Sequence, residues 1–250
     1  MSRILITIPT WNEEVVIGDN LTILREAVSR LLPQHDVLIE VADNGSTDRT
    51  RTIVHEVMEY GAGNAHGSDP SVEVQLLELS GKGKGIAIRR SWERHLGDAD
   101  ILAFMDADLA ADLAALPALV DCVAVGKSDL VCGSRYVEGS RIERGFARDV
   151  MSKTYRVLQR AILHLPVQDA QCGFKAISSR AAAALLPHCL EDGWMFDTEL
   201  IAFASGKGMS VAEIPVAWIE HRDPRRRSAL RLFRHGWGFI SGLWRIRTRV

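Results

Sequence analysis

The sequence predicts an α/β fold in which a mostly parallel central sheet is covered by helices on both faces. Three observations lead to this prediction. Apolar strand-like runs alternate with helix-length segments through the N-terminal half, and the strands are apolar along most of their length. Such strands are typical of sheets that are covered on both faces. Polar residues then follow the strands, and at 250 residues the chain can bury a substantial core.

The expected elements follow one another in βαβ order. Strands are expected at 3–8, 37–42 and 72–77 and in the run that ends at Asp106, helices at 15–32, 47–60 and 85–96, and a further helix at 149–165. The turn-rich segment 61–71 is expected to be a connector within one domain. The sequence contains no internal repeat.

Two aspartates end the most informative of these strands. The apolar run Ile101 to Met105 is followed directly by Asp106 and, one residue later, by Asp108. Ligands of open α/β sheets bind beyond the carboxyl ends of the strands, and acids are seldom buried there without a partner. Two carboxylates at this spacing can approach one divalent cation. The alternative is an ordinary turn into a helix near Asp112, since aspartate is also a common cap.

The first strand is followed by Pro9, Thr10, Trp11, Asn12 and Glu13. The proline fixes a turn, and the aromatic ring of Trp11 can form a wall against a nucleobase. The same segment also fits a helix start, with Thr10 or Asn12 as cap and the glutamate near the positive end of the helix dipole.

Two further strand ends carry polar residues. In the segment 43–48 (DNGSTD), Ser46 is a candidate N-cap, whereas capping does not explain Asp43. In the segment 81–85 (GKGKG), glycines allow an anion to approach the backbone, and Lys82 and Lys84 supply positive charge. This loop lacks the spacing of a Walker A motif. Because the ends of parallel strands meet at one sheet edge, all these segments are expected to line one crevice.

The composition indicates the compartment. No apolar run has the roughly 18 residues of a membrane span, and the N-terminus has no signal-like core. We therefore expect a cytoplasmic protein, or one that acts peripherally on the cytosolic face of a membrane. The four cysteines show neither CxxC nor zinc spacing, so reduced thiols are expected.

The charge is unevenly distributed along the chain. The formal net charge is −2, but residues 221–250 contain nine arginines and one acid, so this segment is a basic module on an acidic body. An apolar stripe at helical spacing lies within it, formed by Leu230, Phe233, Trp237, Ile240 and Trp244. The stripe fits a helix at a lipid headgroup surface. It equally fits a helix that packs on the body or on a second copy of the chain.

In their order and separations, the segments 8–13, 43–48 and 83–85 and the pair Asp106 and Asp108 resemble the family 2 glycosyltransferases of the GT-A fold. The resemblance extends over nearly the whole chain. It implies a catalytic domain at 1–220 with 221–250 as a basic appendage. This chain has Trp11 where tyrosine is commoner, and Ala42 where a second acid often stands.

The same resemblance implies the donor site. It assigns a nucleoside-diphosphate sugar, GDP- or UDP-linked, to the crevice, together with Mg²⁺ or Mn²⁺ on Asp106 and Asp108. The implied nucleotide contacts are Pro9, Trp11, Glu13, Asp43, Lys84 and Asp106.

The second half resembles the polyprenyl-phosphate transferases of this family, the dolichol-phosphate mannose and glucose synthases. The matching segments are 133–136 (GSRY), 169–175 (DAQCGFK), 193–200 (GWMFDTEL) and 213–216 (EIPV). The resemblance implies that Arg135, Arg148 and Ser152 grip the acceptor phosphate. Arg148 and Ser152 also stand four apart at the start of the predicted helix, on one face near its positive end. For Arg148, the alternative is a solvated surface charge.

Two groups have looser assignments. Arg222 and Ser228 fall where relatives carry a loop that closes over both substrates. Asp197 is the candidate general base if the acceptor is a saccharide hydroxyl in polysaccharide or glycoconjugate synthesis. Alternatively, Asp197 and Glu199 are core-edge acids paired with arginine. A polyprenyl phosphate acceptor is already anionic and needs no base.

Two other classes of protein fit the sequence less well. A sugar nucleotidyltransferase is expected to carry a glycine-rich loop after its first strand, and segment 9–13 is no such loop. A nucleic-acid binder can use a basic tail, but the acidic body and the convergent strand ends argue against it. We therefore expect no nucleic-acid partner, and a homo-oligomer is left open.

Overall fold

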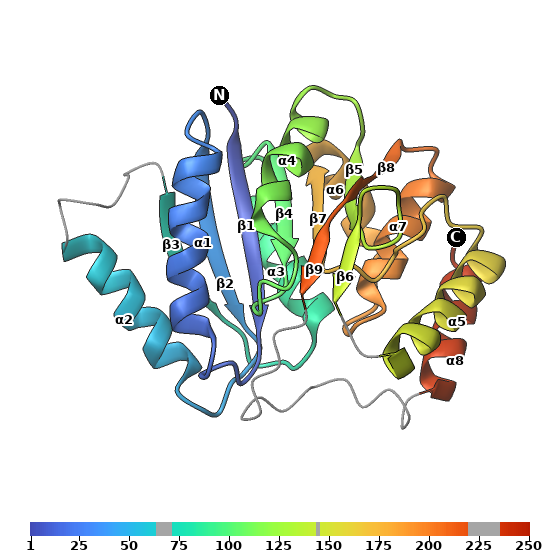
Figure 1. The fold of residues 1–250 in the computed structure, drawn as a ribbon, viewed down its shortest axis with the longest axis horizontal. Helices are drawn as coiled ribbons and strands as arrows, with labels where there is room; N and C mark the ends of the chain where they lie inside the picture. Colours follow the sequence, from blue (N-terminus) through green and yellow to red (C-terminus); the bar gives the residue numbers. More distant parts are fainter. Residues whose placement is uncertain (64–71, 144–145, 220–235) are drawn as a thin grey trace.

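The structure is a computed structural model that describes residues 1–63, 72–143, 146–219 and 236–250. For residues 61–63, 143, 146–154 and 236–240 it describes the backbone alone. Figure 1 shows a central sheet with helices on both sides.

The first half alternates strictly between strands and helices. The elements are β1 (Arg3–Thr10), α1 (Ile17–Leu31), β2 (Asp36–Asp43), α2 (Thr50–Gly63), β3 (Val72–Glu78), α3 (Lys84–His95) and β4 (Ile101–Met105). Strand β1 pairs in parallel with β2 and β4, and β2 pairs in parallel with β3. The predicted βαβ order is confirmed, with ends that differ by a few residues.

The second half is less regular. Its elements are η1 (Leu113–Ala115), α4 (Leu116–Ala124), β5 (Leu130–Ser134), β6 (Arg141–Glu143), α5 (Phe146–Leu163), β7 (Phe174–Ser178), α6 (Ser179–Leu185), η2 (Leu186–His188), α7 (Phe196–Gly206), β8 (Val211–Pro215), β9 (Ala217–Ile219) and α8 (Gly236–Arg247). The helix predicted at 149–165 corresponds to α5, which begins and ends slightly earlier.

The strand order of the main sheet is β3-β2-β1-β4-β7-β5-β8. Strand β7 runs antiparallel to both of its neighbours, β4 and β5, whereas the other pairs are parallel. A two-stranded sheet of β6 and β9 lies beside the main one. The predicted mostly parallel sheet is therefore confirmed, with one antiparallel strand inserted next to β4.

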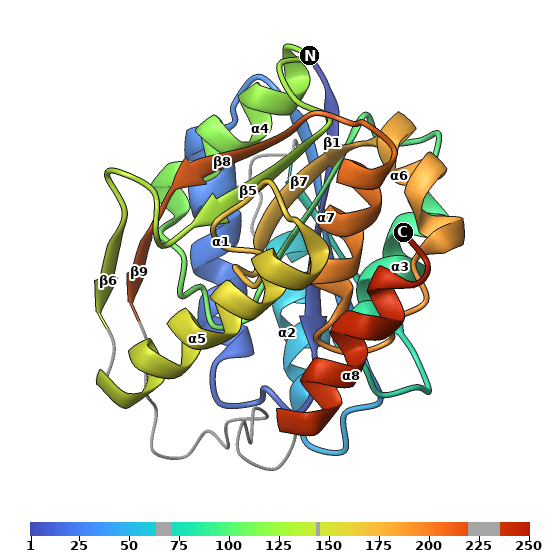
Figure 2. The ribbon, with the colours of Figure 1, turned by 90° about the vertical axis from the view of Figure 1, so that its right-hand side faces the viewer.

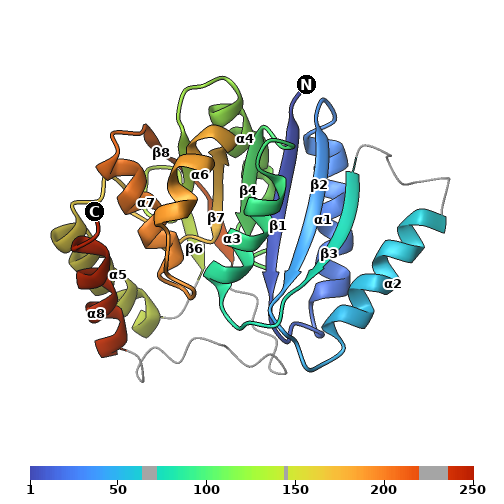
Figure 3. The same ribbon diagram turned by 180° about the vertical axis from the view of Figure 1, so that it is seen from behind.

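The core has two parts, one on each face of the sheet. Helices α1, α2 and α4 cover one face, and α3, α6 and α7 cover the other (Figures 1 and 3). On the second face Trp92 of α3 is fully buried, and its ring lies 5.9 Å from that of Phe104 and 6.2 Å from that of Phe196. This aromatic packing holds the start of α7 close to α3 and β4.

The C-terminal helix α8 lies beside α5 (Figure 2). Its residues Leu243 and Ile246 are fully buried in the core, whereas Trp244 is 58% exposed. The last turns of the basic segment therefore pack on the body through a face that does not include Trp244. Residues 220–235, with Leu230 and Phe233 of the predicted stripe, lie outside the described residues. Among the helices that the structure describes, none combines the length and the apolarity needed to cross a bilayer.

Candidate active site

The end of β4 places Asp106 at the sheet edge against Gly173, which precedes β7. The amide of Asp106 donates to the carbonyl of Gly173 at 3.1 Å. A Cβ atom at position 173 would lie 2.0 Å from Oδ2 of Asp106, so only glycine leaves room for this carboxylate. The antiparallel strand β7 thus brings residue 173 into contact with the first of the two predicted acids.

Asp106 belongs to a buried network of charges. Nζ of Lys84 lies 2.9 Å from Oδ1 of Asp106 and 3.1 Å from Oδ2 of Asp197. Nζ of Lys175 lies 2.8 Å from Oδ1 of Asp197 and also donates to the carbonyl of Cys172. Lys175 is fully buried and Asp197 is 1% exposed. Two lysines and two aspartates therefore balance one another, as buried charges require, and the network reaches the surface at Asp106, whose side chain is 24% exposed.

This network shifts the pKa values of its members in opposite directions. Burial, with Asp108 and Asp197 nearby, raises the pKa of Asp106, although Lys84 opposes this. Burial also acts to raise the pKa of Asp197, but Lys175 and Lys84 outweigh it and the pKa is lowered. Burial acts to lower the pKa of Lys84, but Asp106 and Asp197 outweigh it and the pKa is raised. Asp197 is therefore held as a carboxylate and Lys84 as a cation.

Asp106 and Asp108 fit a hard divalent cation in their chemistry. Asp108 is one cause of the raised pKa of Asp106, so the two carboxylates repel each other, and a cation would relieve that repulsion. Oδ1 of Asp108 accepts the amide of Ala110 at 3.2 Å. The described part of the chain contains no group of three or more acidic, cysteine or histidine residues placed to hold a metal. Mg²⁺ commonly takes one or two carboxylates and completes its shell with water and phosphate oxygens.

The loops after β1 and β2 are joined by hydrogen bonds. The amide of Asn12, at φ 55°, donates to the Ser46 hydroxyl at 2.9 Å, and the Thr47 amide donates to Oδ1 of Asn12 at 2.8 Å. The amide of Glu13 donates to Oγ1 of Thr50 at 2.9 Å. The predicted convergence of these two strand ends is thus present in the structure.

Trp11 is the first residue after β1, and Asp43 is the last residue of β2, so each lies at the start of one of these loops. Nζ of Lys82 lies 3.2 Å from the centre of the Trp11 ring. Asp43 is fully buried, and its carboxylate accepts the Ser46 amide at 3.1 Å and Nε of Arg51 at 2.6 Å. Pro9, at the end of β1, pairs with Ala42. Nothing in the sequence marks Arg51 as a partner of Asp43, because an arginine in a helix is an ordinary surface residue.

The predicted acceptor residues are only partly described. Arg135 is bound by Asp169 through a fork: Nε lies 2.7 Å from Oδ2 and Nη2 lies 2.8 Å from Oδ1. Glu213 holds Asp169 in turn, by accepting its amide at 2.9 Å. Arg148 and Ser152 lie on α5, but their side chains are outside the description. Arg222 and Ser228 lie outside the described residues, so these four assignments stay predictions.

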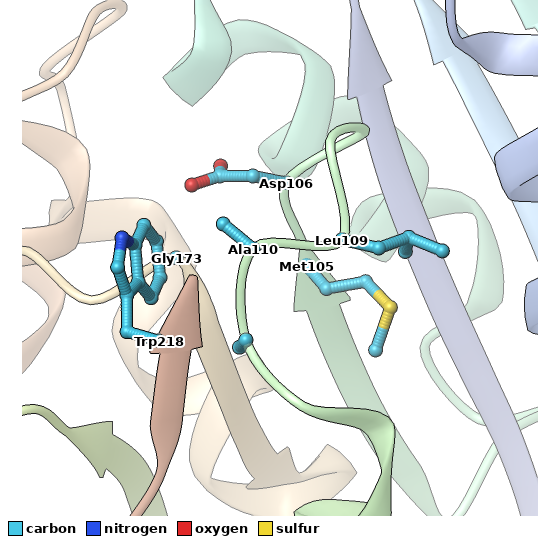
Figure 4. A pocket seen from close by; sticks show the side chains of 7 residues that line it. Met105, Asp106, Leu109, Ala110, Gly173 and Trp218 are labelled. Atoms are coloured by element: carbon cyan, nitrogen blue, oxygen red, sulfur yellow. The ribbon is translucent and has the colours of Figure 1, made fainter. Parts of the chain in front are cut away.

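A small pocket opens beside Asp106 (Figure 4). It is lined by Met105, Asp106, Leu109, Ala110, Ala111, Gly173 and Trp218. The carboxylate of Asp106 points toward the side on which Trp218 lies (Figure 4). Trp218 and Lys175 were not singled out from the sequence. Lys175 ends the matching segment 169–175, but that match assigns it no role. A single tryptophan in a short strand carries no signal of its own.

Fold and site together define a class, the glycosyltransferases of the GT-A fold. A solved structure that is similar to the chain is glucosyl-3-phosphoglycerate synthase from Mycobacterium tuberculosis, in a complex with Mn²⁺, UDP and glucosyl-3-phosphoglycerate. The similarity has a TM-score of 0.69 at 20% identity and covers 99% of this chain and 80% of that one. The model of glycosyl transferase family 2 matches residues 5–186, and the chain belongs to this family.

Curated relatives cover nearly the whole chain. Glycosyltransferase AglD of Haloferax volcanii is 30% identical over 99% of this chain, but the match spans only 38% of that protein. The dolichyl-phosphate beta-glucosyltransferase of Dictyostelium discoideum is 26% identical over 97% of this chain and 76% of its own length. Polyprenol monophosphomannose synthase of Mycolicibacterium smegmatis is 29% identical over 87% of this chain and 78% of its own length.

Proposed function

We propose that this enzyme transfers one sugar from a nucleoside-diphosphate sugar to a polyprenyl phosphate. One observation carries the proposal: the carboxylate of Asp106, directly after β4, lies 2.9 Å from Nζ of Lys84 and near enough to Asp108 for the two acids to repel each other. Cations and acids in this arrangement suit a diphosphate with its metal ion. Relatives that are named for transfer to dolichyl or polyprenol phosphate support this choice of acceptor.

In this proposal Asp108, with help from Asp106, holds Mg²⁺ or Mn²⁺. When bound, the ion neutralises the diphosphate leaving group and orients it. Lys84 stays cationic beside Asp106 and adds positive charge to the same region. Pro9, Trp11, Glu13 and Asp43 form the nucleoside end of the site.

The acceptor end supplies the nucleophile. A phosphate oxygen of the lipid attacks the anomeric carbon, a new C–O bond forms, the bond to the diphosphate breaks, and the configuration is inverted. Arg135, Arg148 and Ser152 orient the attacking phosphate. Asp169 presets the guanidinium of Arg135 before the lipid arrives, through two N–H contacts.

The state of Asp197 favours a phosphate acceptor over a sugar hydroxyl. A hydroxyl nucleophile needs a base, and the candidate is Asp197. Lys84 and Lys175 each bond one of its oxygens, and its pKa is lowered. A buried carboxylate in that state is a weak base. Transfer to a saccharide hydroxyl remains the second candidate.

We assign catalysis to residues 1–220 and contact with a lipid surface to the basic segment 221–250. We further assign closure over both substrates to Arg222 and Ser228, which lie outside the described residues. The exposed Trp244 and the arginines of α8 suit an anionic interface. In this proposal the enzyme binds peripherally to the cytosolic face of the membrane, where it can reach the phosphate of the acceptor lipid.

The test is sugar transfer from a panel of UDP- and GDP-sugars to detergent-dispersed polyprenyl phosphate, with Mg²⁺ or Mn²⁺ present. Asp108→Ala is compared with Asp98→Ala, a matched change at an exposed aspartate that precedes β4 at its opposite end. We expect lipid-linked sugar from the wild type and from Asp98→Ala, and none from Asp108→Ala. Product that forms only with a saccharide acceptor would refute the lipid-phosphate assignment.

A further inference from the structure

The pocket beside Asp106 has one aromatic wall, the indole of Trp218. The side chain is half-buried, and it faces a pocket whose other lining is aliphatic apart from the carboxylate of Asp106. Figure 4 shows the indole and the carboxylate on the same side of this opening. The opening therefore combines an aromatic side chain with one convergent polar group.

The backbone fixes Trp218 relative to the pair of aspartates. The amide of Ile219 donates to the carbonyl of Ala110 at 2.9 Å, and the amide of Asp112 donates to the carbonyl of Ala217 at 2.9 Å. These two bonds flank Trp218 and tie β9 to the segment that directly follows Asp108. The indole therefore keeps its place when the acids keep theirs.

The guanidinium of Arg135 also contacts the indole ring of Trp218. Cζ of Arg135 lies 4.7 Å from the centre of the indole ring. The guanidinium is itself fixed, because Asp169 binds it through two N–H groups. A tryptophan that is fixed by backbone and cation–π contacts, yet keeps part of its surface open, is prepared to bind a ligand at low entropic cost.

We propose that Trp218 is the platform on which the sugar ring of the donor stacks. This inference rests on the proposed function. A pyranose ring presents C–H groups on its faces and hydroxyls on its rim. The electron-rich face of an indole attracts the C–H groups, and a carboxylate beside it accepts hydrogen bonds from the hydroxyls. The pocket offers both, and its carboxylate, that of Asp106, is one of the two acids assigned to the diphosphate end of the donor.

A nucleobase is the other flat ligand that stacks on an indole, and the structure provides a separate tryptophan for it. Trp11 follows β1, beside the Asp43 loop and under the ammonium of Lys82. Trp218 lies on the other side of β4, toward β7 and β9. The two tryptophans therefore divide the donor, with the base on one and the sugar on the other.

The experiment compares Trp218→Ala and Trp218→Phe with Tyr60→Ala, a control change at an exposed aromatic residue of α2. Each protein is assayed for kcat/KM of the nucleoside-diphosphate sugar and for inhibition by the same nucleoside diphosphate without its sugar. We expect Trp218→Ala to lower kcat/KM about tenfold and to leave the inhibition constant unchanged. Trp218→Phe and Tyr60→Ala should stay near the wild type.

Two results would overturn the inference. One is equal weakening of the sugar nucleotide and of the free nucleoside diphosphate, and the other is a Trp218→Ala protein with unchanged kcat/KM for the donor. If Trp218→Ala does not fold, Trp218→Leu keeps an apolar side chain without a ring face and must show the same selective loss. A wild-type enzyme that transfers no sugar from any donor would instead refute the proposed function, so the two failures are distinguishable.

Discussion

Gly173 and Asp106 touch each other across the junction of β7 and β4, at a separation that leaves no room for a side chain on residue 173. A Cβ atom there would lie 2.0 Å from one carboxylate oxygen and 2.6 Å from the other. Gly173→Ala must therefore turn the carboxylate away from its present position. We expect kcat to fall by about 100-fold, because small misplacements of a catalytic group have costs of this size.

The matched control for this change is Gly193→Ala, since a Cβ atom at residue 193 meets nothing within 4 Å. Both variants are assayed for sugar transfer and for thermal unfolding. A Gly173→Ala enzyme with wild-type kcat would mean that the position of the Asp106 carboxylate is unimportant.

Lys175 is fully buried and bonds Asp197. Lys175→Met leaves that carboxylate buried with one cationic partner instead of two. We expect the free energy of unfolding to fall by about 3–5 kcal/mol, the usual cost of breaking a buried pair. Urea unfolding measures this loss, and Lys127→Met, at an exposed lysine, is the control.

The double variant Lys175→Met with Asp197→Leu removes both charges and should recover part of the loss. Additive losses in this double-mutant cycle would show that the two residues do not interact.

The pH dependence of activity should report on Asp106. Burial raises its pKa, and Lys84 opposes that rise. The ionised carboxylate is the form that holds a metal ion, so activity is lost as the pH falls through this raised pKa. In Lys84→Met the opposing charge is gone, so the pKa rises further. The acidic limb of residual kcat/KM should move to higher pH by about one to three units.

Lys127→Met is again the control, and its pH profile should match that of the wild type. If the acidic limb does not move in Lys84→Met, the pH dependence of activity does not arise from the ionisation of Asp106.

Arg249 anchors the C-terminal end of the chain to α7. Its Nη1 lies 2.7 Å from Oε1 of Glu199, a fully buried carboxyl group whose pKa is raised, chiefly by burial. Arg249 is among the groups that oppose this rise. We expect Arg249→Met to lower the free energy of unfolding by about 1–3 kcal/mol at pH 7, because the carboxylate loses a charged partner.

The effect should depend on pH with a definite sign. Since the pKa of Glu199 in the folded state is above the ordinary value of 4.5, its contribution to stability is lost as the pH rises from about 4.5. Arg249→Met raises that pKa further, so stability should fall more steeply with pH than in the wild type. Urea midpoints across this range measure the slope, with Arg247→Met, at the exposed last residue of α8, as control. If stability falls with pH at the same slope in Arg249→Met and in the wild type, Arg249 does not lower the pKa of Glu199.

The parallel half of the fold was predictable because its signals are local. Apolar runs, turn residues and helix-length spacers place β1 to β4 and bring Asp43, Lys84 and Asp106 to one edge. The insertion of β7 between β4 and β5 was not predictable, because strand order depends on pairings between segments far apart in sequence.

The partners of charged residues were equally hidden. Nothing local indicates that Arg135 is bound by Asp169, or that Lys175 is buried against Asp197. In α8 the predicted stripe included Trp244, whereas the structure buries Leu243 and Ile246. Arginines and apolar residues are present on both faces of this helix. The sequence therefore did not determine which face packs on the body.

The reversed direction of β7 has a consequence for how such an enzyme can diversify. A parallel strand ends at the crevice, but β7 begins there, so the chain that leads into it, up to Gly173, forms part of the pocket wall. Insertions or exchanges in that incoming stretch would reshape one side of the crevice and leave the register of β1 to β4 intact. A single reversed strand thus separates the part of the chain that we propose binds the nucleotide from the part that is open to a new acceptor.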